Sequence, residues 1–371
     1  MNLSLVEKIA NAVLYEGYIL YPYRPSAVKN QQRWNFGALC PRTYSEAQRG
    51  TESWTMQTEC LAQGNEKTVL DVKVRFLHLV MREVGTVNAE CGLRITDCLD
   101  KEVSAFISDY DVKTVAALEV NGQLFQTWQE ATERDVSLPE IELSAALDQA
   151  QRLTFSFPSS RAIEVLRDEQ SSGRVVGVIC RRQQSIEGEV EIKAERAVEG
   201  VFKITVSILN RTPFEDAEQQ SRDEALMRSM VSTHTILGAH EGEFISLLDP
   251  PEIALEAAAL CHNTGTYPVL VGEEGARDCM LSSPIILYDY PQIAPESAGE
   301  LFDGTEIDEI LTLRIMTLTD EEKREMRDAD ERARRILERT ELLPAEQLMK
   351  MHGAMKSVKP KEKEKGQAAR Q

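Results

Sequence analysis

Apolar residues recur at two different spacings along the chain, and these spacings separate helical from extended regions. Between residues 3 and 15 the apolar positions follow helical spacing, which predicts a short amphipathic helix that ends before Gly17. From Thr68 onwards the sequence VLDVKVRFLHLVMREV alternates apolar and polar residues, which predicts a long strand. Further strands are expected at residues 116–120, 153–157, 175–181, 185–196 and 201–210.

Two of these strands are joined by a turn residue. The segments SIEGEVEIKAERAV and GVFKITVSILNRTP meet near Glu199 and Gly200, and glycine accepts the positive φ that a tight turn requires. The pair is therefore predicted to form a β-hairpin. Short strands at this spacing favour an antiparallel sandwich or barrel.

The second half of the chain mixes helical and extended patterns. Residues 218–240 place apolar residues at mixed helical spacing, which predicts a helix followed by a loop. The segment PPEIALEAAALC predicts a second short helix, because proline is tolerated in the first turn. YPVLVG and SPIILYDY are apolar runs that fit buried strands. The spacing of Thr319 and Glu322 predicts a capping box before a charged helix through Leu337.

These elements predict an α+β protein with a central antiparallel, β-rich and sandwich-like body. An N-terminal helix and aromatic loop would occupy residues 1–67, and the β-rich body residues 68–212. A C-terminal α/β portion that ends in the charged helix would occupy residues 213–340. The end of the chain, SVKPKEKEKGQAARQ, almost lacks apolar residues, so residues 341–371 are expected to form a mostly disordered tail.

Composition narrows the class of protein. The chain has 371 residues, of which 42% are hydrophobic and 28% charged, as in ordinary globular proteins. No stretch approaches the roughly 18 consecutive apolar residues of a membrane-spanning helix, and the N-terminus does not resemble a signal peptide. The seven cysteines lack the dense pattern of a disulfide-rich domain. We therefore expect a cytoplasmic protein without a membrane span and with reduced thiols.

The charge balance bears on the partners. The chain has 61 acidic and 42 basic residues and a net charge of −19, which would repel a phosphate backbone. Nucleic acid is therefore not an expected partner, whereas a basic protein is compatible with this charge.

Sulfur and imidazole groups raise a metal site as an alternative. The ligand atoms that zinc and nickel prefer are carried by Cys261, His262, Cys279, His234 and His240. Their spacing departs from the paired pattern of structural zinc sites, which favours buried thiols, structural histidines and no cofactor. Cys261 could also act as a nucleophile with His262 or His234 as base, but adjacent residues on a helix point in different directions. No P-loop, dinucleotide-binding or serine-hydrolase motif is present, so no catalytic residue is assigned.

Aromatic and basic residues gather in two segments that could contact a partner. Tyrosine, tryptophan and arginine are enriched in interface hot spots. The candidates are Tyr21, Tyr23, Arg24, Arg33 and Trp34 near the N-terminus, and Tyr288 and Tyr290 in YDYPQIAPES. Packing of the N-terminal rings in the core or in a lid is the alternative. The carboxylates between residues 289 and 309 suit a solvated turn better than a cation site or a catalytic site.

Three segments of the chain resemble a known family. The family consists of bacterial proteins often encoded among nickel–iron hydrogenase structural and maturation genes, and the similar segments are YEGYILYPYRPSAVKNQQRWNFGALCP, EFISLLDPPEIALEAAALCHNTGTYPVLVG and LSSPIILYDYPQIAPESAGELFDGTEIDEILTLRIMTLTDEEK. The resemblance covers most of residues 1–340 and carries no catalytic residue. It implies a non-catalytic accessory protein that binds a hydrogenase subunit or a maturation factor during assembly or maturation. The alternatives are a metal-handling protein or metalloenzyme, and an enzyme with a pocket under the loop at residues 15–36.

Overall fold

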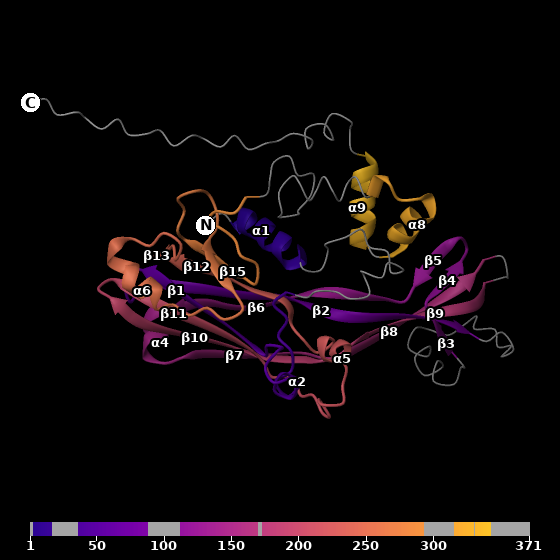
Figure 1. Ribbon diagram of the computed structural model, residues 1–371, viewed down its shortest axis with the longest axis horizontal. Coiled ribbons are helices and arrows are strands. Elements are labelled where there is room, and N and C mark those ends of the chain that lie inside the picture. Colours follow the sequence, from indigo (N-terminus) through magenta and orange to yellow (C-terminus); the bar gives the residue numbers. More distant parts are fainter. Residues whose placement is uncertain are drawn as a thin grey trace, which may run out of the picture.

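The computed structural model describes residues 3–16, 36–87, 112–169, 173–292, 315–329 and 331–342. These residues form two large antiparallel sheets, a small hairpin and several helices (Figure 1). The α+β class and the β-rich, sandwich-like body expected from the sequence are therefore confirmed. No helix in these ranges is long and apolar enough to cross a membrane.

The first sheet has five strands in the order β13-β1-β11-β10-β7. Its strands are β1 (Thr55–Gln63), β7 (Gln151–Phe157), β10 (Ile186–Val198), β11 (Val201–Asn210) and β13 (Glu243–Ile245). The predicted hairpin is confirmed, because β10 and β11 pair in antiparallel register and Gly200 between them has a φ of 73°. Successive residues point to opposite faces, so one face of the sheet is apolar and the other is largely polar.

The second sheet is built around β2 (Val69–Val87), a strand of 19 residues. On one side of β2 lie first β12 and then β9, and on the other side first β6 and then β3. The remaining strands extend the sheet beyond β12 and β9 in the order β14-β15-β12-β2-β9-β8. Besides β2, the strands of this sheet are β3 (Val112–Val115), β6 (Trp128–Glu142), β8 (Ser160–Asp168), β9 (Arg174–Gln183), β12 (Val231–His240), β14 (Tyr267–Leu270) and β15 (Cys279–Ser283). A separate hairpin is formed by β4 (Ala117–Val120) and β5 (Gln123–Gln126).

The main core lies between the apolar face of the first sheet and the half of β2 that pairs with β12. Phe76 of β2 is fully buried there, and its ring centroid lies 6.1 Å from that of Phe155 and 5.8 Å from that of Phe157. A Cβ atom on Gly188 would collide with the Phe155 ring on the neighbouring strand. Glycine is therefore required at this position of β10 for the ring to pack on the sheet.

Helices cover parts of the second sheet. The predicted N-terminal helix is confirmed as α1 (Leu3–Glu16), which packs Val6, Ile9 and Val13 against side chains of β12, β14 and β15. Two further helices, α8 (Asp320–Ala329) and α9 (Glu331–Leu342), lie beside each other on the side of β5 and β2 (Figure 1). The predicted capping box is confirmed, since Thr319 Oγ1 accepts the Glu322 N–H at 3.3 Å and Glu322 Oε2 accepts the Thr319 N–H at 2.8 Å. The other helical segments are α2 (Arg42–Ala47), α4 (Leu143–Asp148), α5 (Arg222–Leu226), the 3₁₀ turn η2 (Glu252–Ala254) and α6 (Leu255–Ala259).

Two predictions about the second half of the chain are wrong. Residues 231–240 were expected in a helix and loop, but they form the strand β12. All of β12 except its last residue is buried, because α1 covers one face and the main core the other. A strand that is buried on both faces shows no alternation to distinguish it from a helix. The run SPIILYDY was expected to be a strand, but β15 ends at Ser283, before Pro284, which has no N–H to donate to a sheet.

Strands from two of the predicted portions of the chain share one sheet. β12, β14 and β15 come from residues 213–340, and they pair in the same sheet as β2 and β9 from residues 68–212. Side chains from both sides of the expected boundary at residue 212 contribute to the main core. The expected tail lies almost entirely outside the described residues, which end at Leu342.

Candidate functional site

The predicted partner-binding residues fall into three groups. Tyr21, Tyr23, Arg24, Arg33 and Trp34 lie outside the described residues. Tyr288 is 84% exposed. Tyr290, in contrast, is partly buried against the main core, and its N–H donates to the Leu270 carbonyl at 2.8 Å. Of the two predicted tyrosines that lie in the described part of the chain, Tyr288 is therefore the one that offers its ring to a partner.

The candidate metal ligands do not gather, since the described residues contain no group of three or more His, Cys, Asp or Glu that could hold an ion. His234 is buried on β12 and Cys279 on β15, whereas His240 is exposed, with its Nε2 2.8 Å from Asp71 Oδ2. Burial lowers the pKa of His234 to about 4 and raises that of Cys279 to about 12. Both groups are therefore neutral at pH 7. The zinc or nickel alternative stays a prediction, which elemental analysis of the purified protein can decide.

Cys261 and His262 are adjacent, but their contacts give them separate structural roles. The Cys261 thiol donates to the Ala257 carbonyl at 3.5 Å, one turn back along the chain. Burial, together with the charge of the nearby Glu59 carboxylate, raises the pKa of this thiol to about 11. The reactive thiolate is therefore almost absent at neutral pH. His262 binds Glu59 through its backbone, because its N–H donates to Glu59 Oε2 at 2.8 Å.

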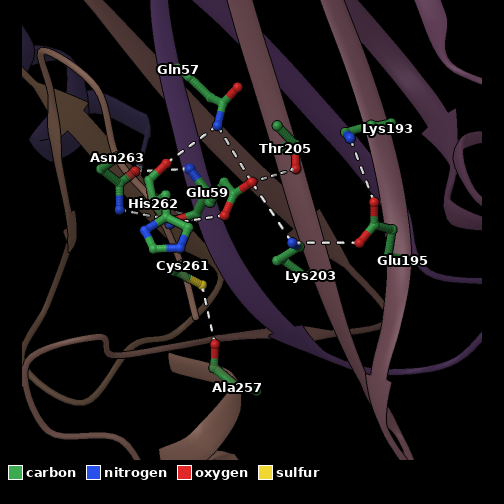
Figure 2. Close-up of polar contacts among 10 residues, drawn as sticks. All are labelled: Gln57, Glu59, Lys193, Glu195, Lys203, Thr205, Ala257, Cys261, His262 and Asn263. Carbon is green, nitrogen blue, oxygen red and sulfur yellow. Dashed lines mark hydrogen bonds and ion pairs between the residues drawn. The ribbon is translucent and has the colours of Figure 1, made fainter. Parts of the chain in front are cut away.

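Glu59 is the centre of a polar network that no sequence motif indicated (Figure 2). It lies on the polar face of β1, and its side chain is 9% exposed. The carboxylate also accepts from Gln57 Nε2 at 3.4 Å and from Thr205 Oγ1 at 3.5 Å. Lys203 Nζ lies 3.7 Å from Glu59 Oε1 and 3.4 Å from Glu195 Oε2, so one ammonium group joins two carboxylates.

The loop after α6 is also fastened to the backbone of β1. Asn263 forms two hydrogen bonds with Glu59, since its Oδ1 accepts the Glu59 N–H at 2.8 Å and its Nδ2 donates to the Glu59 carbonyl at 3.2 Å. Gln57 and Thr264 exchange two backbone hydrogen bonds, of 3.1 and 2.9 Å. The loop therefore lies along β1 like a short extra strand, on the side that β13 occupies further along. Glu59 is thus an anchor for the end of α6, and both of its carboxylate oxygens have partners.

A shallow hollow lies between α4 and β10, and its Glu195 carboxylate does not suit the role of a general acid. Its volume is about 580 Å³, and its lining is formed by Glu66, Ser144, Leu147, Asp148, Ala194, Glu195 and Arg196. Arg196 forms an ion pair with Glu66, and the Lys203 ammonium lowers the pKa of Glu195. A carboxylate that stays ionised is a poor general acid. The alternative pocket under the aromatic loop involves residues 17–35, which lie outside the described residues.

The segment η2–α6 has its small residues inside and its large residues outside. Ala254 and Ala257 are buried against the ends of β1, β11 and β13. In contrast, Ile253 is 66% exposed, Leu255 50% and Leu260 64%. Helices of soluble domains normally bury their large aliphatic side chains. The orientation of this segment therefore leaves three large aliphatic side chains exposed to solvent.

Exposed apolar side chains are concentrated around this segment. Seven of the eleven large hydrophobic residues that are exposed in the described ranges lie between residues 248 and 288. We define the cap surface as Leu248, which is 57% exposed and precedes η2, together with Ile253, Leu255 and Leu260. Ser246 Oγ donates to Asp289 Oδ2 at 2.5 Å, which brings the turn that contains Leu248 beside the turn that contains Tyr288. Such a concentration is typical of an interaction site.

Comparisons with known proteins give no family assignment. No protein-family model matches the chain, and no curated protein matches it either. The function must therefore be inferred from the geometry of the described residues and from the resemblance carried by the three sequence segments.

Proposed function

We propose that the protein is a non-catalytic accessory protein that binds another polypeptide through the cap surface. The observation that carries this proposal is the orientation of η2–α6, in which alanines pack inward while Ile253, Leu255 and Leu260 face solvent. Burying one aliphatic side chain of this size contributes about 1.5–3 kcal/mol. A few such side chains suffice as the hot spot of an interface.

The anchor at Glu59 supports this role. The contacts of Glu59 with His262 and Asn263 hold the end of α6 on β1 before any partner arrives. Side chains that are already positioned lose less entropy on binding, which favours affinity. The network in Figure 2 therefore serves to present the cap surface rather than to perform chemistry.

The choice of partner in this proposal rests on the resemblance to proteins encoded with nickel–iron hydrogenases. A hydrogenase subunit or a maturation factor would occupy the cap surface during assembly or maturation. The turn that carries the exposed Tyr288 lies beside the turn of Leu248, so the Tyr288 ring would extend the contact area. Tyrosine is well suited to this because its ring is large and rigid and ends in a polar group.

Replacing Ile253 and Leu260 with serine is expected to abolish the association without unfolding the protein. Both side chains are more than half exposed, so the thermal midpoint should change by no more than about 2 °C. Loss of two hot-spot side chains should weaken binding at least about tenfold. The measurement is the amount of hydrogenase and maturation polypeptides that co-purify with the tagged full chain from cells that produce them.

The double variant M316S/L342S is the matched control. Met316 is 50% exposed and precedes α8, and Leu342 is 81% exposed and ends α9. Both helices lie away from α6 (Figure 1). This variant should retain the same polypeptides as the unchanged chain. The proposed function is wrong if no hydrogenase or maturation polypeptide co-purifies with the unchanged chain, or if I253S/L260S retains them fully.

A further inference from the structure

Along the chain, the residues of the cap surface alternate with acidic residues and not with basic ones. Between residues 229 and 276 the chain contains seven carboxylates and neither lysine nor arginine. Three of these acids, Asp249, Glu252 and Glu256, are exposed and alternate in sequence with the apolar residues of the cap surface. No ion pair among the described residues involves these three. We refer to them as the acidic rim.

The nearby ammonium group of Lys203 does not neutralise the acidic rim. Lys203 approaches the loop after α6 from β11, but its Nζ is already shared between Glu59 at 3.7 Å and Glu195 at 3.4 Å. The rim therefore presents uncompensated negative charge directly beside exposed aliphatic side chains.

We propose that the occupant of the cap surface is a basic segment of a partner polypeptide, whose apolar side chains are flanked by lysine or arginine. This inference rests on the proposed function and adds the chemistry of the partner. The aliphatic side chains of the cap supply contact area, and the acidic rim pairs with the flanking cations. The net charge of −19 acts in the same direction by attracting a basic chain over longer distances.

A second copy of this chain fits the surface less well. A two-fold contact brings the same patch of both copies together. The carboxylates of Asp249, Glu252 and Glu256 would then lie against a patch that carries the same negative charge. Like charges that are pressed together oppose association. The charge pattern therefore favours a basic partner over a homodimer.

Two designed helical peptides provide a direct test on the full chain. Each has about 14 residues with leucine at helical spacing, and the remaining positions are lysine in one peptide and glutamate in the other. Fluorescence anisotropy measures their binding at about 50 and 300 mM salt. The lysine peptide should bind at least about tenfold more tightly at low salt, and the difference should shrink at high salt.

Charge-matched variants separate the acidic rim from the overall charge. D249N/E252Q/E256Q should weaken binding of the lysine peptide about tenfold at low salt. E215Q/D216N/E218Q removes three exposed carboxylates from the turn before α5, which packs near α2, and should change the affinity less than about twofold. I253S/L260S should weaken binding at both salt concentrations, because it removes the apolar contact.

Several outcomes would overturn the inference. Equal weakening by the two charge variants would mean that net charge alone attracts the peptide. Equal affinity for both peptides would remove the acidic rim from recognition. If sedimentation shows a homodimer and I253S/L260S abolishes it, the occupant of the cap surface is a second copy of the chain. Residues 343–371 contain seven basic and three acidic residues. If a peptide with this sequence binds more tightly than the lysine peptide, the occupant of the cap surface is this segment of the chain itself. None of these outcomes depends on co-purification of hydrogenase polypeptides, which tests the proposed function separately.

Discussion

Replacing Glu59 with alanine is expected to lower the free energy of unfolding by about 2–4 kcal/mol. The Glu59 side chain is 9% exposed and accepts the His262 N–H at 2.8 Å, so its removal leaves this donor without its acceptor. Lys203 retains Glu195 as a partner at 3.4 Å, which limits the loss. Urea denaturation of the full chain measures the change through the shift of the midpoint at constant slope.

The same substitution should loosen the end of α6 more than it loosens the sheets. Asn263 keeps its two hydrogen bonds to the backbone of residue 59, so the loop stays attached but less firmly. Amide hydrogen exchange in residues 254–262 should become at least about tenfold faster, while the amides of β10 and β11 change only as much as global stability requires.

Glu59→Gln is the matched variant for this prediction. Its side chain keeps one carbonyl oxygen that can accept from His262, so it should lower the free energy of unfolding by roughly half as much or less. Unchanged hydrogen exchange around α6 in the alanine variant would show that Glu59 does not anchor the cap surface.

The anchor could not be predicted because its parts are far apart in the sequence. Asn263 lies 204 residues after Glu59, and nothing near either residue indicates that they meet. Their contact depends on the strand register, which sets Glu59 opposite Thr205 and leaves the other edge of β1 to the loop after α6. Register of this kind arises from packing of the whole sheet, to which a short sequence window has no access.

Strands such as β10 and β11, in which apolar and polar residues alternate, were predicted from the sequence. β6 was not predicted, because charged and polar residues interrupt both of its faces. Glu130 of β6 pairs with Arg82 of β2 at 3.0 Å, and Glu133 pairs with Arg75 at 3.1 Å. Backbone pairing and these cross-strand charges hold β6 on β2, so it does not need the alternation that marks a strand in the sequence.

At the candidate site the sequence predicted the helix but not its exposure. PPEIALEAAALC carries apolar residues around most of the helix, interrupted by Glu252 and Glu256, so its pattern does not decide which of the apolar residues turn inward. Ala254 and Ala257 pack against the ends of the strands, so the side of the helix that carries these alanines turns inward. The docking role predicted for Tyr288 falls in the same region of the fold, although Ile253, Leu255 and Leu260 were not among the predicted partner-binding residues.

We expect His234 to make the protein sensitive to acid. Burial lowers its pKa from 6.5 to about 4, an effect that the hydrogen bond to the Ser232 carbonyl opposes and the Arg75 guanidinium increases. The unfolded chain takes up the proton near pH 6.5, but the folded protein takes it up only near pH 4. The stabilising contribution is therefore complete above pH 6.5 and is lost as the pH falls from 6.5 to about 4. At about 1.4 kcal/mol per pKa unit, the loss is about 3 kcal/mol.

The measurement for His234 is the free energy of unfolding between about pH 7 and pH 4.5 in the unchanged chain, His234→Gln and His240→Gln. Carboxylates titrate in the same range in all three proteins, so the contribution of His234 is the difference between their slopes. His234→Gln should lose about 2 kcal/mol less than the unchanged chain over this range, because glutamine takes up no proton. His240→Gln is the exposed control: it removes a surface contact with Asp71, so it should change the slope less than His234→Gln does. His78, whose pKa burial also lowers to about 4, remains in all three proteins and so cancels from the comparison.

A folded-state NMR titration that places the His234 imidazole near pH 6.5 would mean that the packing around β12 admits the proton, and the acid sensitivity would then need another origin.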